Sequence, residues 1–301
     1  MRLVVANGTA LEVDDQGPAG AEPVLLVMGL CMQLVAWPDE LVQRLLAQGH
    51  RVIRFDNRDA GLSQGFDGLG KPNLAAAGVR HLLHLPVKPP YTLADMADDT
   101  LGLIDALHLP RVHLVGASMG GMIAQHLAAR HPQRVASLAL LMTTRGARHL
   151  PQPGWDIRAL LLQRPDGRDV EAVVAHLERV MRAIGSPGFP PEPQALRDRL
   201  RATVARAWRP AGTARQLAAV VADGDRRALL PRIQAPTVVI HGEADPLVPV
   251  QAGHELARLI AGAEADFIPG MGHDLPQPLL ARLADRIVAN ARRASAERPP
   301  A

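Results

Sequence analysis

The chain is poor in several residue types that would point to common classes of protein. Its 301 residues include one cysteine, Cys31, and only 3% aromatic residues. Lys71 and Lys88 are the only lysines, so arginine carries almost all of the positive charge. A single cysteine excludes an internal disulfide bond and provides no cluster of thiolate metal ligands. We therefore expect a fold held together by its hydrophobic core. No metal and no organic cofactor is expected either.

Long apolar runs and strong net charge are also missing. A membrane span would require about 18 consecutive apolar residues, and no such stretch occurs. Residues 1–8 lack the apolar region of a signal peptide. The formal net charge is only +3. The sequence has no basic stripe interleaved with aromatic residues, which a nucleic-acid interface would need. We expect a cytoplasmic protein with neither a membrane nor a nucleic-acid partner, and the sequence carries no signal for its oligomeric state.

What the chain does contain is a regular series of apolar segments. Hydrophobic residues make up 48% of it, which is ample for one large core. Short strand-like segments alternate with helical patterns, and this predicts an α/β fold with parallel strands joined by helical crossovers. Asn7-Gly8 favours a hairpin turn, so the sheet is expected to begin with an antiparallel edge. The predicted strands are Leu3–Ala6, Ala10–Asp14, Val24–Met28, Arg51–Phe55, Val112–Val115, Ser137–Met142, Thr237–Ile240 and Ala265–Ile268.

A helical block interrupts this series between about Gly146 and Arg232. A block of this kind is most simply interpreted as a lid over the C-terminal edge of the sheet, where ligands bind in open α/β sheets. The segment 66–90, without clear periodicity, is expected to contribute to the entrance of the site. Three helices are predicted in the block: Asp169–Ile184, Pro193–Trp208 and Thr213–Ala222.

The domain boundaries follow from this interruption. We predict a core formed by residues 1–145 and 233–294, a helical lid formed by residues 146–232, and a flexible tail at residues 295–301.

The strongest chemical signal is the pentapeptide GASMG at residues 116–120, with Ser118 at its centre. It lies directly between the predicted strand Val112–Val115 and a predicted helix, Met119–Arg130. A nucleophilic serine on a sharp strand-to-helix turn needs small residues two positions before and two positions after it. The N-terminus of the following helix also stabilises the negative charge that develops on the substrate. Because both sides of the motif fit, we predict that Ser118 is a nucleophile rather than part of an ordinary glycine-rich turn.

A serine nucleophile needs a base, and the base needs an acid that orients it. Among twelve histidines, His273 lies in a glycine-flanked loop between the last predicted strand and the last predicted helix. Asp245 follows the strand Thr237–Ile240, and its position before His273 matches the chain order acid, then histidine. The other place for the acid, residues 142–145, holds no carboxylate. We therefore predict His273 as the base and Asp245 as the acid.

An oxyanion hole requires two backbone N–H donors near the serine. The predicted donors are the amide of Met119, which follows the nucleophile, and the amide of Leu30, in the loop after the strand Val24–Met28. Gly29 allows the backbone to approach the substrate. Cys31, which is close by, is expected to be a buried and inert thiol.

Other polar residues in these loops receive structural assignments. Glu243 is the nearest rival of Asp245 and is expected to lie on the surface. Asp274 is expected to point away from the base or to cap the final helix. The remaining histidines considered as bases are expected to be exposed or satisfied by hydrogen bonds: His50, His113, His126, His131 and His254.

Along nearly its full length the chain resembles enzymes of the α/β-hydrolase fold. The resemblance rests on Gly29-Leu30, on the segment 54–63 (RFDNRDAGLS), on the Ser118 motif and on the loops of Asp245 and His273. With Trp37-Pro38, the first two segments are similar to those of bacterial esterases of the aclacinomycin methylesterase type, relatives of enol-lactonases and cofactor-free haloperoxidases. The resemblance implies a mostly parallel, eight-stranded type of sheet with helices on both faces and an inserted helical lid.

The resemblance also bears on two details. It implies that Asp56, Arg58 and Asp59 form a structural turn that braces the nucleophile through charged hydrogen bonds and takes no part in catalysis. The chain departs from the family at Met28, where many members carry histidine. Met28 lies in the loop that holds Leu30, so the departure bears on the second predicted oxyanion donor.

Together these features predict a carboxylic-ester hydrolase with a small-molecule substrate. The reaction is acyl transfer to water through an acyl-enzyme, on a small or medium ester with an apolar acyl group or a methyl ester. A serine at position 118, in place of aspartate, excludes the relatives that form an alkyl-enzyme ester. An enol-lactonase or an acyltransferase is the alternative on the same residues, and a non-catalytic binding protein is the alternative from another class.

Overall fold

The computed structural model describes residues 1–167 and 169–296. Its centre is an eight-stranded sheet with the strand order β1-β2-β4-β3-β5-β6-β7-β8. The first two pairings, β1 with β2 and β2 with β4, are antiparallel, and all others are parallel. The strands are β1 (Arg2–Ala6), β2 (Thr9–Gln16), β3 (Pro23–Val27), β4 (Arg51–Phe55), β5 (Val112–Ala117), β6 (Val135–Leu141), β7 (Thr237–Gly242) and β8 (Glu264–Ile268).

The antiparallel edge begins with a tight hairpin. Asn7 and Gly8 both have positive φ, 50° and 74°, which is the backbone that a two-residue hairpin turn requires. Ala6 therefore pairs directly with Thr9, and the predicted hairpin is confirmed.

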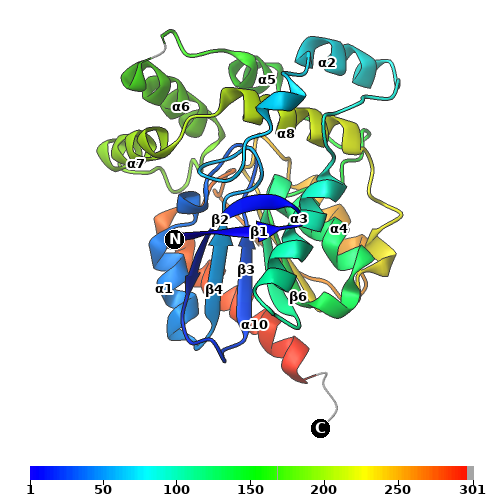
Figure 1. Cartoon of the computed structure of the whole chain (residues 1–301). Coiled ribbons are helices and arrows are strands. Elements are labelled where there is room, and N and C mark those ends of the chain that lie inside the picture. The colour runs from blue at the N-terminus through cyan, green and yellow to red at the C-terminus, as the bar shows by residue number, and fades with distance from the viewer. Residues whose placement is uncertain (168, 297–301) are drawn as a thin grey trace.

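Helices cover both faces of the sheet, as predicted (Figure 1). Alternate residues of β3 show the division: Val24 and Leu26 pack into the apolar cluster that includes α1 and α10, whereas Leu25 and Val27 pack into the cluster that includes α3, α4 and α9. This alternation is the consequence of the two-residue period of a strand buried on both sides. The helices are α1 (Asp39–Ala47), α3 (Leu93–Ala106), α4 (Met119–Arg130), α9 (Gln251–Leu259) and α10 (Leu280–Ala296).

A helical insert with α5 to α8 lies between the end of β6 at Leu141 and the start of β7 at Thr237. Figure 1 shows its helices, together with α2, gathered beyond one end of the sheet. Two ion pairs tie the insert to the loop after β4: Arg206 with Asp56, and Arg215 with Asp59. The helices concerned are α5 (Trp155–Leu162), α6 (Val170–Ile184), α7 (Pro193–Arg206), α8 (Pro210–Asp223) and α2 (Leu74–Leu82).

Two of these helices differ from the sequence prediction. The insert contains α5 in addition to the three predicted helices, and the segment 66–90, predicted without periodic structure, contains α2. Each buries a single residue, Ile157 in α5 and Ala77 in α2. Both are also short, with eight residues in α5 and nine in α2, whereas an apolar period is recognised over a window of about 11–18 residues.

The last helix, α10, extends to residue 296. The tail predicted for residues 295–301 thus begins inside a helix, and residues 297–301 lie outside the described residues. Among the helices that the structure describes, none combines the length and the apolar character needed to cross a membrane.

Candidate active site

Ser118 lies on a strained turn between β5 and α4. Its backbone has φ 53° and ψ −119°, a region that costs a residue with a side chain roughly 1–3 kcal/mol. Neighbouring groups hold this conformation: the Ser118 amide donates to the Leu141 carbonyl oxygen (2.9 Å), and Thr143 Oγ1 donates to the Ser118 carbonyl oxygen (2.7 Å). The turn presents the Ser118 side chain at the C-terminal edge of the sheet.

The two glycines of the motif are required by packing. A Cβ atom on Gly116 would overlap the carbonyl of Gly120, and a Cβ atom on Gly120 would overlap the carbonyl of Val27 in β3. Backbone atoms cannot move aside as the end of a flexible side chain can. The small residues on either side of Ser118 therefore let α4 start directly against β5 and β3.

The structure brings the three predicted site residues together in one chain of hydrogen bonds. His273 Nε2 lies 3.0 Å from Ser118 Oγ, and His273 Nδ1 lies 2.7 Å from Asp245 Oδ2. The histidine is buried, with 8% of its surface exposed, and Asp245 is buried beneath it. Since the carboxylate can only accept, Nδ1 donates to it, and the lone pair on Nε2 faces the serine hydroxyl.

The loop that carries His273 is anchored to the helical insert. The His273 amide donates to the Ile184 carbonyl oxygen at the end of α6 (2.7 Å). The Gly272 amide donates to Ser186 Oγ (2.8 Å), and Ser186 Oγ in turn donates to Asp274. The insert therefore helps to set the position of the histidine.

Asp245 is held in its charged form by its surroundings. Burial alone would raise its pKa, but the electrostatic interaction with His273 and hydrogen bonds from His241, His273 and the backbone outweigh burial and lower the pKa to about 2. The backbone donors are the amides of Leu247 (2.9 Å) and Val248 (2.8 Å), both to Oδ1. An ionised carboxylate beside Nδ1 is suited to orient the imidazole.

His241 is a neighbour of this group that the sequence reasoning missed. Its Nε2 lies 2.7 Å from the Val248 carbonyl oxygen and 3.5 Å from Asp245 Oδ2. The residue is fully buried at the C-terminal end of β7, four positions before Asp245. The sequence does hold a signal for this residue, which is a histidine directly before the loop of the acid.

The rival residues lie elsewhere or play other parts. Glu243 is exposed, in agreement with the surface position expected for it. His254 is exposed, and His126 Nε2 lies 2.8 Å from Asp223 Oδ1, away from the serine.

Two neighbouring residues line the cavity at Ser118. Asp274 accepts a hydrogen bond from Ser186 and not from His273, and burial raises its pKa. The expectation that Cys31 is buried was wrong: it is exposed, with a φ of 57° and an amide that donates to Gln216 Oε1 (2.8 Å).

Of the two predicted oxyanion donors, Met119 directly follows the serine in the chain and Leu30 directly follows Gly29. Gly29 packs so closely against the serine that an added Cβ would lie 3.1 Å from Ser118 Cβ. Asn57 Nδ2 donates to the Met28 carbonyl oxygen (2.9 Å) and so fixes the start of this loop. Within residues 1–167 and 169–296, the amides of Leu30 and Met119 have no hydrogen-bond acceptor. Both N–H groups are therefore available to a ligand.

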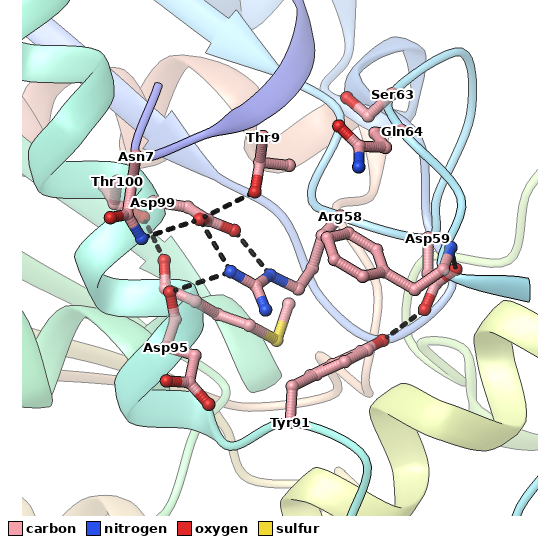
Figure 2. A network of polar contacts seen from close by, with 12 residues as sticks. Asn7, Thr9, Arg58, Asp59, Ser63, Gln64, Tyr91, Asp95, Asp99 and Thr100 are labelled. Carbon is pink, nitrogen blue, oxygen red and sulfur yellow. Dashed lines mark hydrogen bonds and ion pairs between the residues drawn. The ribbon is translucent and has the colours of Figure 1, made fainter. Parts of the chain in front are cut away.

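The segment with Asp56, Arg58 and Asp59 makes the charged hydrogen bonds that the resemblance implied. Figure 2 shows Arg58 directed at Asp99, to which its Nε and Nη2 donate at 2.6 and 2.7 Å. Tyr91 OH donates to Asp59 Oδ2 (2.7 Å). Asp56 accepts from the Leu34 and Leu62 amides (2.6 and 2.9 Å). The network links the loop after β4 to α3, away from the serine hydroxyl.

A cavity of about 220 Å³ opens beside Ser118 and His273. The core contributes the serine, the histidine and the loop with Gly29, and the insert contributes a mostly apolar wall. The residues of that wall include Leu161, Leu177, Val180, Met181, Leu200 and Val204. A ligand bound there would contact apolar side chains on one side and the polar groups on the other.

In the part of the chain that the structure describes, one group of residues has three possible metal ligands close together: Glu22, His50 and His113. His113 lies near the start of β5, whereas Ser118 follows its end, so this group is at the opposite edge of the sheet. It is separate from the chemistry at Ser118.

The sheet has eight strands and is mostly parallel. A serine lies on a strained turn after β5, and a histidine from the loop after β8 is hydrogen-bonded to it. Together these features define the α/β-hydrolase class. Residues 22–276 match the α/β hydrolase fold family, and the chain belongs to this family.

Known relatives cover almost the whole chain. It is 29% identical over 313 residues to the rhodomycin D methylesterase DauP of Streptomyces sp. (strain C5), and the alignment covers 98% of this chain and 99% of that protein. It is 34% identical over 260 residues to the pimeloyl-[acyl-carrier protein] methyl ester esterase of Chromobacterium violaceum, covering 82% and 97%. The resemblance to bacterial methylesterases is confirmed, and these names agree with the prediction of a carboxylic-ester hydrolase.

Solved structures share the fold. The enol-lactonase from Burkholderia xenovorans LB400 superposes with a TM-score of 0.69 over 97% of this chain and 100% of that one, at 24% identity. At this identity the comparison shows the architecture alone.

Proposed function

We propose that the protein hydrolyses carboxylic esters, with Ser118 as nucleophile, His273 as general base and Asp245 as the acid that orients it. The observation that carries the proposal is the hydrogen-bonded chain of the three side chains, with 3.0 Å from Ser118 Oγ to His273 Nε2 and 2.7 Å from His273 Nδ1 to Asp245 Oδ2. These distances lie within the reach that proton transfer between nucleophile and base requires.

The reaction follows from this geometry. His273 Nε2 accepts the hydroxyl proton as Ser118 Oγ attacks the ester carbonyl carbon. The bond from this carbon to the alcohol oxygen then breaks, and the proton on Nε2 passes to the leaving alcohol. A water molecule next gives a proton to Nε2 and attacks the carbonyl carbon of the acyl-enzyme. The bond from this carbon to Ser118 Oγ then breaks, the proton on Nε2 passes back to Oγ, and the carboxylic acid leaves.

The amides of Leu30 and Met119 are suited to bind the oxyanion that forms in both steps. Neither has an acceptor in the described part of the protein, so no internal hydrogen bond must break when the oxyanion develops. Each donor of this kind contributes roughly 3–4 kcal/mol to the transition state. The strained turn at Ser118 places one of them, the first amide of α4, directly beside the nucleophile.

The helical insert acts as a lid in this proposal. Its apolar side chains line the cavity beside Ser118, which favours a small or medium ester with an apolar acyl group or a methyl ester. Two of the relatives are named methylesterases. Ion pairs and backbone hydrogen bonds join the lid to the loops after β4 and β8, so we expect it to be a fixed wall of the pocket.

The substrate class can be tested with a panel of esters. We expect measurable kcat/KM for open-chain methyl esters and short p-nitrophenyl esters, and lower values for enol-lactones of matched size. A preference for enol-lactones would favour the lactonase alternative on the same residues. Transfer of the acyl group to an added alcohol faster than to water would favour the acyltransferase. No turnover of any ester by folded protein would favour a binding protein.

Replacing Asp245 with asparagine should lower kcat by about 10³–10⁴-fold, because an amide can donate to Nδ1 and stabilise the wrong imidazole tautomer.

The pKa of Asp245 is about 2, against 3.8 in the unfolded chain, so the charged carboxylate stabilises the fold above about pH 4. This stabilisation is lost as the pH falls toward 2. The difference in melting temperature between the wild type and Asp245→Asn should therefore shrink over that interval; a constant difference would contradict the assignment.

A further inference from the structure

We propose that Glu22, His50 and His113 form a binding site for a divalent transition-metal ion, for which zinc is the best match, at the N-terminal edge of the sheet. One ring nitrogen of each histidine and one carboxylate oxygen of Glu22 lie within 4.8 Å of one another. Two imidazoles and a carboxylate are a ligand set that zinc takes in proteins. The site is independent of the ester chemistry at Ser118.

The sheet topology places the three ligands in one row. Glu22 directly precedes β3, His50 directly precedes β4, and His113 is the second residue of β5. These strands are neighbours in the order β4-β3-β5, and Val24 in β3 pairs with His113. A bound ion would therefore cross-link the starts of three adjacent parallel strands.

The hydrogen bonds of the histidines prepare them for this role. His113 Nδ1 lies 3.0 Å from Ser137 Oγ, and His50 Nδ1 lies 3.3 Å from the Glu22 carbonyl oxygen. When Nδ1 donates to such an oxygen, the lone pair of the imidazole is on Nε2, as in most metal-binding histidines. His113 Nε2 then faces Glu22 Oε2 at 3.3 Å.

Two acceptors at this distance repel each other unless a proton or a cation lies between them. Ligand atoms at the corners of a zinc tetrahedron are about 3.3 Å apart for bonds of about 2.0 Å, which matches the separation of Nε2 and Oε2. Zinc fits this gap between the histidine and the carboxylate.

The burial of the ligands decides how an ion enters. His50 and His113 are buried, whereas the Glu22 side chain is 45% exposed, so an ion reaches the site past Glu22.

The test is a zinc titration of the full-length protein after treatment with a chelator. We expect one equivalent to bind by calorimetry and the melting temperature to rise by about 5 °C or more at a zinc concentration 100 times the Kd. Glu22→Gln should weaken binding at least tenfold without loss of ester hydrolysis, since Glu22 is exposed and far from Ser118. The matched control is His254→Gln, which removes an exposed histidine and should leave the zinc Kd unchanged.

Two outcomes would overturn the proposal. If the folded, active wild-type protein binds no zinc, then Ser137 Oγ donates to His113 Nδ1 instead, and the group is a hydrogen-bonded cluster only. If zinc binds but neither Glu22→Gln nor His50→Gln weakens it, the ion occupies another site. Both results leave the proposed ester hydrolysis untouched, because that is measured separately.

Discussion

Ser118→Ala should reduce kcat for short p-nitrophenyl esters by about 10⁴-fold or more, while the melting temperature stays close to that of the wild type. The substitution removes only the hydroxyl that faces His273 Nε2. Alanine keeps the Cβ atom and so retains the same strained backbone at φ 53°. Steady-state kinetics and thermal unfolding on the same preparations check both statements.

Cys31→Ala is the control for a competing nucleophile. Cys31 also lines the cavity, but among the described residues its side chain makes no hydrogen bond with His273. We expect this variant to retain activity within about tenfold. If Cys31→Ala abolished turnover and Ser118→Ala did not, the proposed nucleophile would be wrong.

His273→Ala should have an effect of similar size, about 10⁴-fold or more on kcat. Without the imidazole no group accepts the Ser118 proton, and nothing protonates the leaving alcohol. Added imidazole should restore part of the rate, because the ring of His273 borders the substrate cavity and its removal leaves space there.

The matched control for this variant is His254→Ala. His254 is exposed on α9 and packs against Phe267, with 3.9 Å between the ring centroids. We expect its removal to leave kcat unchanged. Equal losses in both variants would indicate a general effect on the fold and would count against His273 as the base.

The site residues that can be predicted from the sequence lie in local patterns. Ser118, Asp245 and His273 each follow a parallel strand, and the carboxyl ends of parallel strands meet at one edge of the sheet. Although 126 residues separate Ser118 from Asp245 in the sequence, the strands before them bring all three side chains together.

What could not be predicted depends on contacts between distant segments. Ser186 reaches Gly272 and Asp274 from the helical insert, and no local pattern indicates which loop will pack there. Helices α2 and α5 have only nine and eight residues, which is too short for an apolar period to be recognised in the sequence. The sequence predicts His50 and His113 to be ordinary histidines, because their approach to Glu22 depends on the register of three strands.

Labelling with a fluorophosphonate probe tests directly whether Ser118 is the nucleophile. We expect one equivalent of probe to become attached, with loss of fluoride, to the Ser118 oxygen, where peptide mapping by mass spectrometry should find it. Ser118→Ala should not be labelled, and His273→Ala should be labelled far more slowly. Labelling of another residue, or no labelling of folded wild type, would contradict Ser118 as the nucleophile.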